Sequence, residues 1–186
     1  IWLYYSFIGL LIIPWLFLSL IAPQTIVNYS LVPFNKILLL IISGAVFGIG
    51  QICFAYAIEC IGMALSFAIN LSVSTATGSI LIILYRRLFF TIDGLFVICA
   101  VILISISLFS YFFAFKNNKE IINKNYHKAW YLAIFAGLAS GLQNLAFIIL
   151  AFHSLTINTV NTFWIWPLFL SVVAICMIIG FSYKIT

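Results

Sequence analysis

Six stretches of this chain are long and apolar enough to cross a lipid bilayer as helices. A spanning helix needs about 20 consecutive, mostly apolar residues. The stretches cover residues 1–22, 37–61, 63–85, 94–115, 129–152 and 160–183. In the whole chain, 66% of residues are hydrophobic and only 6% are charged, whereas soluble domains have about 25% charged residues. The sequence therefore predicts an all-α integral membrane protein, a bundle of about six transmembrane helices.

Lysine and arginine residues lie at the ends of these stretches and indicate how the chain is oriented. The one clearly aqueous segment, residues 116–128, carries four lysines, and cytoplasmic loops are enriched in basic residues. With this loop in the cytoplasm, that side holds Lys116, Lys119, Lys124, Lys128 and Lys184, and the opposite side holds Lys36, Arg86 and Arg87. The net charge of +5 then reflects topology and contact with the lipid bilayer, and no nucleic-acid partner is expected.

The adjoining stretches 37–61 and 63–85 each carry small and polar residues at helical spacing. The first has Gly44, Gly48, Gln51, Ala55 and Glu59, and the second has Ser66, Asn70, Ser74 and Gly78. Steps of three and four residues place each set on one helix face. Because amides and carboxylates are costly to expose to hydrocarbon, such faces usually meet other helices or a water-filled path. These two helices are therefore a candidate route for a solute.

Two pairs of glycines predict close helix packing. They are Gly44 with Gly48 and Gly137 with Gly141, and amide side chains follow both pairs. Small residues at this spacing let helix backbones approach closely. The recurrence on both sides of the aqueous loop fits a repeated architecture with a site between the repeats. Pro14 and Pro167 each remove a backbone hydrogen bond, and we expect them to kink the first and sixth helices.

The glycines between residues 44 and 78 also form a recognisable pattern. GAVFGIGQ at residues 44–51 is followed by Ile61-Gly62-Met63 and then by Gly78. This pattern resembles the L-rhamnose–proton symporter family of the drug/metabolite transporter superfamily, which shows G-x-x-W-G-I-G, then L-G-M-S and a later G-T. The resemblance implies a ten-helix transporter built of two inverted five-helix halves. This chain would be a fragment holding helices two to seven, and the missing helices of the same polypeptide would be its partners.

On that resemblance, residues 1–115 are four helices of the first half, residues 116–128 are the cytoplasmic loop, and residues 129–186 are two helices of the second half. The chain departs from the family at polar positions. Gln51 stands where the family has Asn or Gly, and Glu59 stands where it has a basic residue. We therefore expect proton-coupled symport of a sugar or related small polar metabolite, rhamnose being one such solute, in the bacterial inner membrane.

Amide side chains are the candidate groups for binding such a solute, because an amide both donates and accepts hydrogen bonds. The candidate substrate-binding residues are Gln51, Asn70, Gln143, Asn144 and Asn161, with Trp164 as an aromatic platform for a sugar ring. Glu59 and His153 are candidates for proton coupling. The alternatives are interhelical hydrogen bonds for the amides and interfacial positions for Glu59 and His153. Helix packing is assigned to Gly44, Gly48, Gly50, Gly62, Gly78, Gly137 and Gly141.

Other classes of function find little support in the sequence. It contains no HExxH motif, no GxSxG nucleophile turn and no GxxxxGK[ST] phosphate loop, so neither an enzyme nor ATP-driven transport is expected. Cysteines lie inside apolar stretches without CxxC or zinc-type spacing, and neither a metal nor another cofactor is expected. The remaining alternative is a non-transporting membrane scaffold or an oligomerising membrane module.

Overall fold

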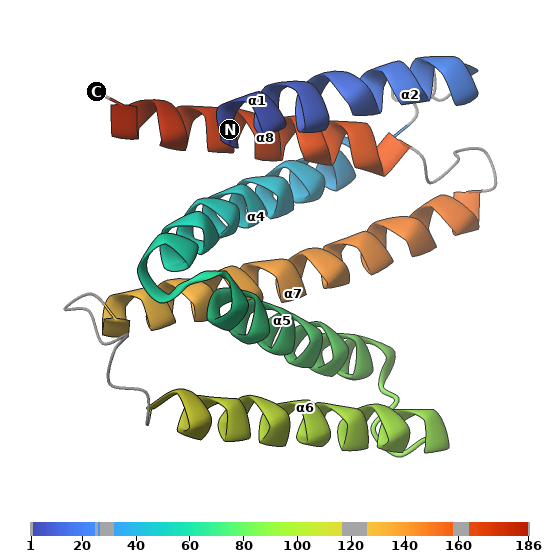
Figure 1. Ribbon diagram of the computed structural model, residues 1–186. Helices are drawn as coiled ribbons and strands as arrows, with labels where there is room; N and C mark the ends of the chain where they lie inside the picture. The colour runs from blue at the N-terminus through green and yellow to red at the C-terminus, as the bar shows by residue number, and fades with distance from the viewer. Residues whose placement is uncertain (1, 25, 27–31, 117–125, 158–163, 186) are drawn as a thin grey trace. The chain divides into compact units, whose positions relative to one another are not determined.

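Long helices make up nearly all of the computed structural model, which describes residues 2–24, 26, 32–116, 126–157 and 164–185 (Figure 1). Five helices in this part of the chain are long and apolar enough to cross a membrane. They are α4 (Phe34–Ile61), α5 (Met63–Arg86), α6 (Ile92–Lys116), α7 (Tyr126–Ile157) and α8 (Ile165–Ile185). Each lies over a stretch that hydropathy predicts, and the all-helical character is confirmed. Five such helices suit a multi-pass membrane protein, whereas the helix over the first of the six predicted stretches, Tyr5–Ile21, is shorter than the other five.

The first predicted span is helical but is not one α-helix. It consists of α1 (Trp2–Tyr4), the π-helix η1 (Tyr5–Ile12) and α2 (Ile13–Ile21). The backbone N–H of Ile13 donates to the carbonyl of Ile8, five residues earlier. The next residue, Pro14, has no N–H, and its ring would collide with the preceding turn of a regular α-helix. The wider π turns before Pro14 relieve that collision, so the disturbance expected at this proline takes the form of a π-helix.

Pro167 lies in the first turn of α8, where a proline removes no helical hydrogen bond. The basis for the kink expected there is therefore absent. The carbonyl of Pro167 instead accepts a hydrogen bond of 2.7 Å from the Ser171 hydroxyl. The Ser171 oxygen in turn accepts a 2.7 Å hydrogen bond from Nε1 of Trp15. This chain of bonds joins α2 to α8.

The chain forms two compact units, each with its own apolar core. The first unit is Ile1–Ile52 with Ala146–Thr186, and the second is Cys53–Leu145, so that α4 and α7 contribute to both. The core of the first unit contains Val32, Leu40, Leu150, Trp164, Ile165, Phe169, Val173 and Met177. The core of the second contains Ala57, Ile61, Leu65, Ile69, Ala129 and Ala133. The division into residues 1–115, 116–128 and 129–186 that the family resemblance implies stays a prediction.

In the first unit, α4 packs against α8 through glycines. A Cβ atom added to Gly44 would lie 3.1 Å from Val172, and one added to Gly48 would lie 2.7 Å from the Cβ of Cys176. Further along, Gly180 of α8 lies against the side chain of Ile52. Residue numbers rise together on both helices, so α4 and α8 run parallel.

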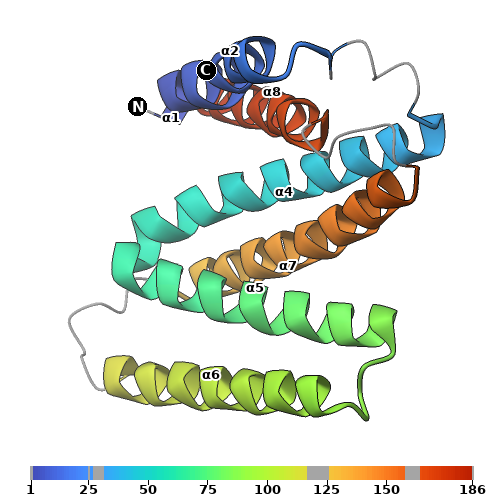
Figure 2. The same ribbon diagram turned by 90° about the vertical axis from the view of Figure 1, so that its right-hand side faces the viewer.

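In the second unit, glycines of α7 pack against α5. A Cβ atom added to Gly137 would lie 2.7 Å from Val73, and one added to Gly141 would lie 2.7 Å from Thr77. These numbers also rise together, so α5 and α7 run parallel. The helix α6 follows α5 as an antiparallel neighbour (Figure 2).

Short turns join the helices of this unit. Gly62 separates α4 from α5 with φ 81° and ψ 162°, a conformation that only glycine adopts readily. It is exposed and has no atom within 4 Å of an added Cβ, so this glycine, assigned to packing from the sequence, instead forms the turn. Arg87 ends α5 in the left-handed region, and the Thr91 hydroxyl caps α6 by accepting a 3.2 Å hydrogen bond from Gly94 N–H. The helix α5 ends at Arg86, one residue beyond the predicted stretch 63–85.

Candidate functional site

The buried polar face of α5 is the first candidate site. The Ser66 side chain is 0% exposed and the Asn70 side chain is 8% exposed. Oγ of Ser66 and Oδ1 of Asn70 have no hydrogen-bond partner among the residues that the structure describes. The two residues are four apart, which places them one above the other on the same helix face. Because an unpaired buried polar group costs about 1–3 kcal/mol, this pair calls for a partner that the described helices do not supply.

The neighbouring helix α7 carries further polar groups along the same contact, here called the α5–α7 seam (Ser66, Asn70 and Gly78 of α5; Gly137, Gly141 and Asn144 of α7). A Cβ on Gly137 would lie 2.9 Å from the backbone oxygen of Asn70. A Cβ on Gly78 would lie 3.1 Å from the side-chain nitrogen of Asn144. Asn70 and Gly78 are two turns apart, about 12 Å along α5. The amide residues Asn70 and Asn144 thus lie along the same seam, but at positions about two helical turns apart.

The other sequence-predicted residues are placed differently. Gln51 is half-buried on α4 and Gln143 is half-buried on α7, while Glu59 is exposed near the end of α4. Trp164 is 1% exposed and is packed in the first core, so its ring offers no open platform in this structure. His153 lies on α7 but its side chain is outside the described part, and Asn161 lies outside the described residues altogether.

The glycines that the sequence assigns to helix packing lie mostly at helix contacts. Gly50 is buried on α4. An added Cβ would collide with the neighbouring helix at Gly48, Gly137 and Gly141 and would make a tight contact of 3.1 Å at Gly44 and Gly78. Ser66 belongs to the predicted stripe but not to the predicted substrate-binding set. Its position four residues before Asn70 was the signal that could have included it.

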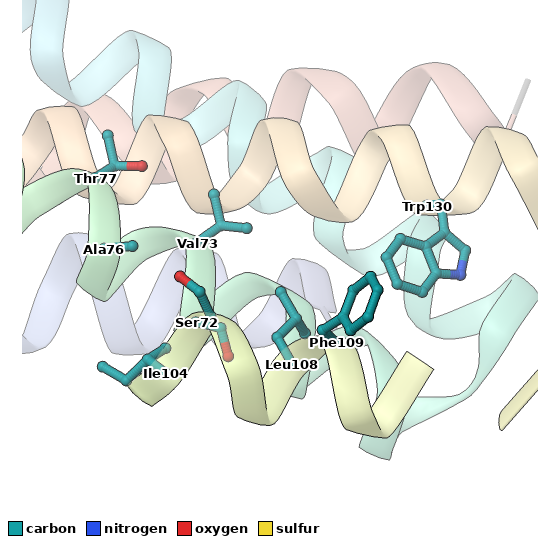
Figure 3. Close-up of a pocket in the computed structure, with 9 residues that line it drawn as sticks. Ser72, Val73, Ala76, Thr77, Ile104, Leu108, Phe109 and Trp130 are labelled. Carbon is teal, nitrogen blue, oxygen red and sulfur yellow. The ribbon is translucent and has the colours of Figure 1, made fainter. Parts of the chain in front are cut away.

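A second candidate site is a crevice of about 500 Å³ within the second unit. It lies between α5, α6 and the first turns of α7 (Figure 3). Its lining residues are Ser72, Val73, Ala76, Thr77, Ile104, Ser105, Leu108, Phe109 and Trp130. None of the sequence-predicted binding or coupling residues is among them. The only sequence signal for it was Trp130 near the start of a spanning stretch, a position typical of membrane interfaces.

Metal chemistry finds no site in the described part of the chain. No group of three or more His, Cys, Asp or Glu residues there could hold a metal ion. Cys53, Cys60, Cys99 and Cys176 are all free thiols. The buried polar atoms of the first candidate site are the hydroxyl of Ser66 and the amide oxygen of Asn70, and both can form hydrogen bonds.

Comparisons of the chain with models of protein families, with curated proteins and with solved structures found no match. The resemblance of residues 44–78 to the L-rhamnose–proton symporter family therefore stays a prediction. What bears on function is the geometry of the chain's own residues, above all the buried polar atoms of Ser66 and Asn70.

Proposed function

We propose that this chain belongs to a secondary transporter that carries a sugar or a related small polar metabolite by proton-coupled symport. The observation that carries the proposal is the pair of buried, unpartnered oxygens on Ser66 and Asn70, inside a helix of membrane-spanning length. The Ser66 hydroxyl can donate and accept, and Oδ1 of Asn70 accepts. Together they can bind neighbouring hydroxyl groups of a solute in a site otherwise shielded from water.

Packing among the described helices does not account for such a pair. Polar residues that serve only packing are hydrogen-bonded across helices, since the alternative is an unsatisfied group in hydrocarbon. Polar residues retained inside spanning helices commonly mark solute or ion paths. The proton-coupled part of the proposal, and the bacterial inner membrane as its location, rest on the family resemblance and on Glu59 as the carboxylate near the end of α4.

A non-transporting scaffold is the second candidate. It is favoured by the glycine contacts at Gly48 and Gly141, which close helix packing explains without any solute. The two candidates differ in what Asn70 does. In a scaffold, replacing an unpartnered buried amide by an apolar residue is harmless or stabilising. In a transporter, the same replacement removes a binding group.

The deciding experiment measures proton uptake into vesicles containing the natural full-length protein, driven by added deoxy sugars. We expect solute-dependent proton movement in the wild type, at least about tenfold less in Asn70→Leu and in Ser66→Ala, and no change in the matched control Asn35→Leu. Asn35 is an exposed amide at the start of α4. Gln143→Ala and Asn144→Ala are expected to weaken uptake more than membrane insertion.

Two results would contradict the proposal. One is the absence of solute-dependent proton movement for every sugar tested, which would favour the scaffold. The other is a loss of uptake in Asn70→Leu that merely parallels a loss of folded protein, measured by size-exclusion chromatography in detergent. That second result would show that Asn70 serves structure alone.

A further inference from the structure

The turn between α5 and α6 carries an arginine in a backbone conformation that favours glycine. Arg87 has φ 56° and ψ 36°, and it is the only non-glycine residue with a positive φ among the described residues. Its N–H donates to the carbonyl of Leu84 at 3.3 Å, and the N–H of Leu88 donates to the carbonyl of Ile83 at 3.0 Å. These two bonds form the Schellman ending of a helix, in which the left-handed residue is usually glycine. Arginine at this position therefore strains the backbone in a way that glycine would not.

This turn lies where the chain leaves the membrane and enters it again. It joins Met63–Arg86 to Ile92–Ser110, two stretches that are long and apolar enough to span a bilayer (Figure 2). In the orientation predicted from the lysine and arginine counts, the turn lies on the non-cytoplasmic side, where basic residues are less frequent. The general enrichment of basic residues in cytoplasmic loops thus does not account for the two arginines. An anionic group bound at the turn would account for them.

Charged and aromatic side chains are exposed together on this turn. Arg86, Arg87 and Asp93 are all exposed. Two guanidinium groups and one carboxylate leave a net charge of +1 on residues 85–93. The Phe90 side chain is 103% exposed, and that of Phe89 beside it is 43% exposed. Apolar rings next to basic side chains are typical of segments that lie in the membrane interface, where the rings reach the acyl chains and the charges stay among the headgroups.

A phosphate group carried by a lipid suits this turn better than a free phosphate ion does. A guanidinium group binds phosphate oxygens through two parallel N–H bonds, whether the phosphate is free or part of a lipid. A free ion would leave the Phe90 ring in water, whereas a phospholipid places an apolar region directly beside its phosphate. The positive charge of the turn further favours a headgroup with a net negative charge.

We propose that the α5–α6 turn, residues 86–92, binds the headgroup of an anionic phospholipid in the leaflet that it meets. Arg86 and Arg87 bind the phosphate, and the rings of Phe89 and Phe90 lie at the boundary between headgroups and acyl chains. This site is independent of the proposed solute path, because Asn70 lies about 24 Å from the end of α5 and the other path residue of this helix lies farther still.

An indole placed on the turn reports which lipid lies against it. The full-length protein with Phe90→Trp is reconstituted in vesicles of phosphatidylcholine and phosphatidylglycerol, and only one of the two lipids carries bromine on its acyl chains. Bromine quenches indole fluorescence at contact, and subtraction of the wild-type signal removes the contribution of the other tryptophans. We expect phosphatidylglycerol to occupy the site roughly fivefold in preference to phosphatidylcholine at equal mole fraction, as a net charge of +1 predicts.

Variants combined with Phe90→Trp separate the charge of Arg87 from its backbone strain. Arg87→Gly removes the charge and relieves the strain, so we expect nearly equal quenching by the two lipids together with an apparent unfolding temperature about 2–4 °C higher. Arg87→Lys keeps both the charge and the strain, and is expected to retain most of the preference. Lys128→Ala is the matched control, because it removes an exposed positive charge at the start of α7, where Ala129 packs with Leu65 near the other end of α5.

Four outcomes would overturn the proposal. Equal quenching by the two lipids in the protein with Phe90→Trp alone would remove the selectivity for an anionic headgroup. A loss of stability in Arg87→Gly that accompanies the loss of preference would show that Arg87 serves the turn itself. An equal loss of preference in Lys128→Ala would assign the effect to the net charge of the protein. Abolition of the preference by millimolar glycerol phosphate would identify a site for a free anion.

Discussion

At the scale of single residues, Gly62 shows how one position shapes a long stretch of chain. The last residue of α4 and the first of α5 are separated by this glycine alone. Its φ of 81° with ψ of 162° lets the chain leave one helix and begin the next without a loop. The space around it is open, with no atom within 4 Å of an added Cβ. Only its backbone conformation, and not packing, therefore requires glycine here.

Gly62→Ala is accordingly expected to lower the free energy of unfolding by about 1–3 kcal/mol, the cost of forcing an L-residue into this region. Unfolding in mixed micelles of detergent and dodecyl sulfate would measure it. The matched control Ala64→Gly changes an exposed residue of α5 two positions later and is expected to cost about 1 kcal/mol or less. A Gly62→Ala protein as stable as the wild type would contradict the strain at this turn.

At the scale of elements, hydropathy predicts where helices lie but not how their hydrogen bonds run. The spans at α4, α5, α6, α7 and α8 follow from stretches of apolar residues, because a bilayer requires long apolar helices. The π-helix η1 could not be predicted in this way, because hydropathy reports how apolar a stretch is and not the spacing of its backbone hydrogen bonds. Pro167 misleads for a related reason, since its effect depends on where the helix begins, which composition does not reveal.

Replacing the glycines at the helix contacts by alanine is expected to destabilise the helix packing. Gly48→Ala and Gly141→Ala each place a methyl group 2.7 Å from a Cβ atom of the facing helix, and both helices must move apart. We expect each to cost about 1–3 kcal/mol of stability. Gly9→Ala is the control, because its added methyl lies 3.4 Å from a Tyr5 ring atom and fits at ordinary contact distance.

A compensating change sharpens this test. Cys176→Gly removes the Cβ that Gly48→Ala would strike, so the double variant is expected to recover part of the lost stability. Additive losses in the double variant, measured by the same micelle unfolding, would show that Gly48 is needed for a reason other than its contact with α8.

At the scale of the whole molecule, helix directions agree with a chain that crosses the membrane at every helix. The parallel pair α4 and α8 has three helices between its members along the chain, and the parallel pair α5 and α7 has one. An odd number of intervening crossings returns a chain to the same direction. The sequence alone predicts this alternation, but it does not predict which helices pack together. A row of glycines indicates that a helix packs closely, but not which helix lies against it.

The orientation of the chain in the membrane can be tested by cysteine labelling. In a background with all four cysteines changed to alanine, Glu120→Cys is expected to react with a membrane-impermeant maleimide only from the cytoplasmic side, and Arg87→Cys only from the other side. Labelling of right-side-out and inverted vesicles would measure this. The reverse pattern would invert the orientation, and labelling of both residues from the same side would contradict an odd number of crossings between them.

The candidate site could be predicted only in part. Asn70 was recognisable from its place on a polar stripe, but the lack of a hydrogen-bond partner depends on what α7 brings to it, which is a property of the fold. Trp164 was predictable as an aromatic residue near an amide, but its burial in the first core depends on how α8 packs. The crevice needs three helices to form, so no local pattern could have revealed it.

The contact between α4 and α8 also has a consequence for the order of events during synthesis. The residue that Gly48 contacts, Cys176, is made on the order of 130 residues later, which takes roughly 10 s at ribosomal speed. Throughout that interval α8 is not yet present to pack against the glycine face of α4. In water an apolar helix face exposed for that long would promote aggregation. In a bilayer the lipid tails are as apolar as a leucine side chain, so they solvate this face. The nascent chain can therefore delay the contact between α4 and α8 until α8 is made.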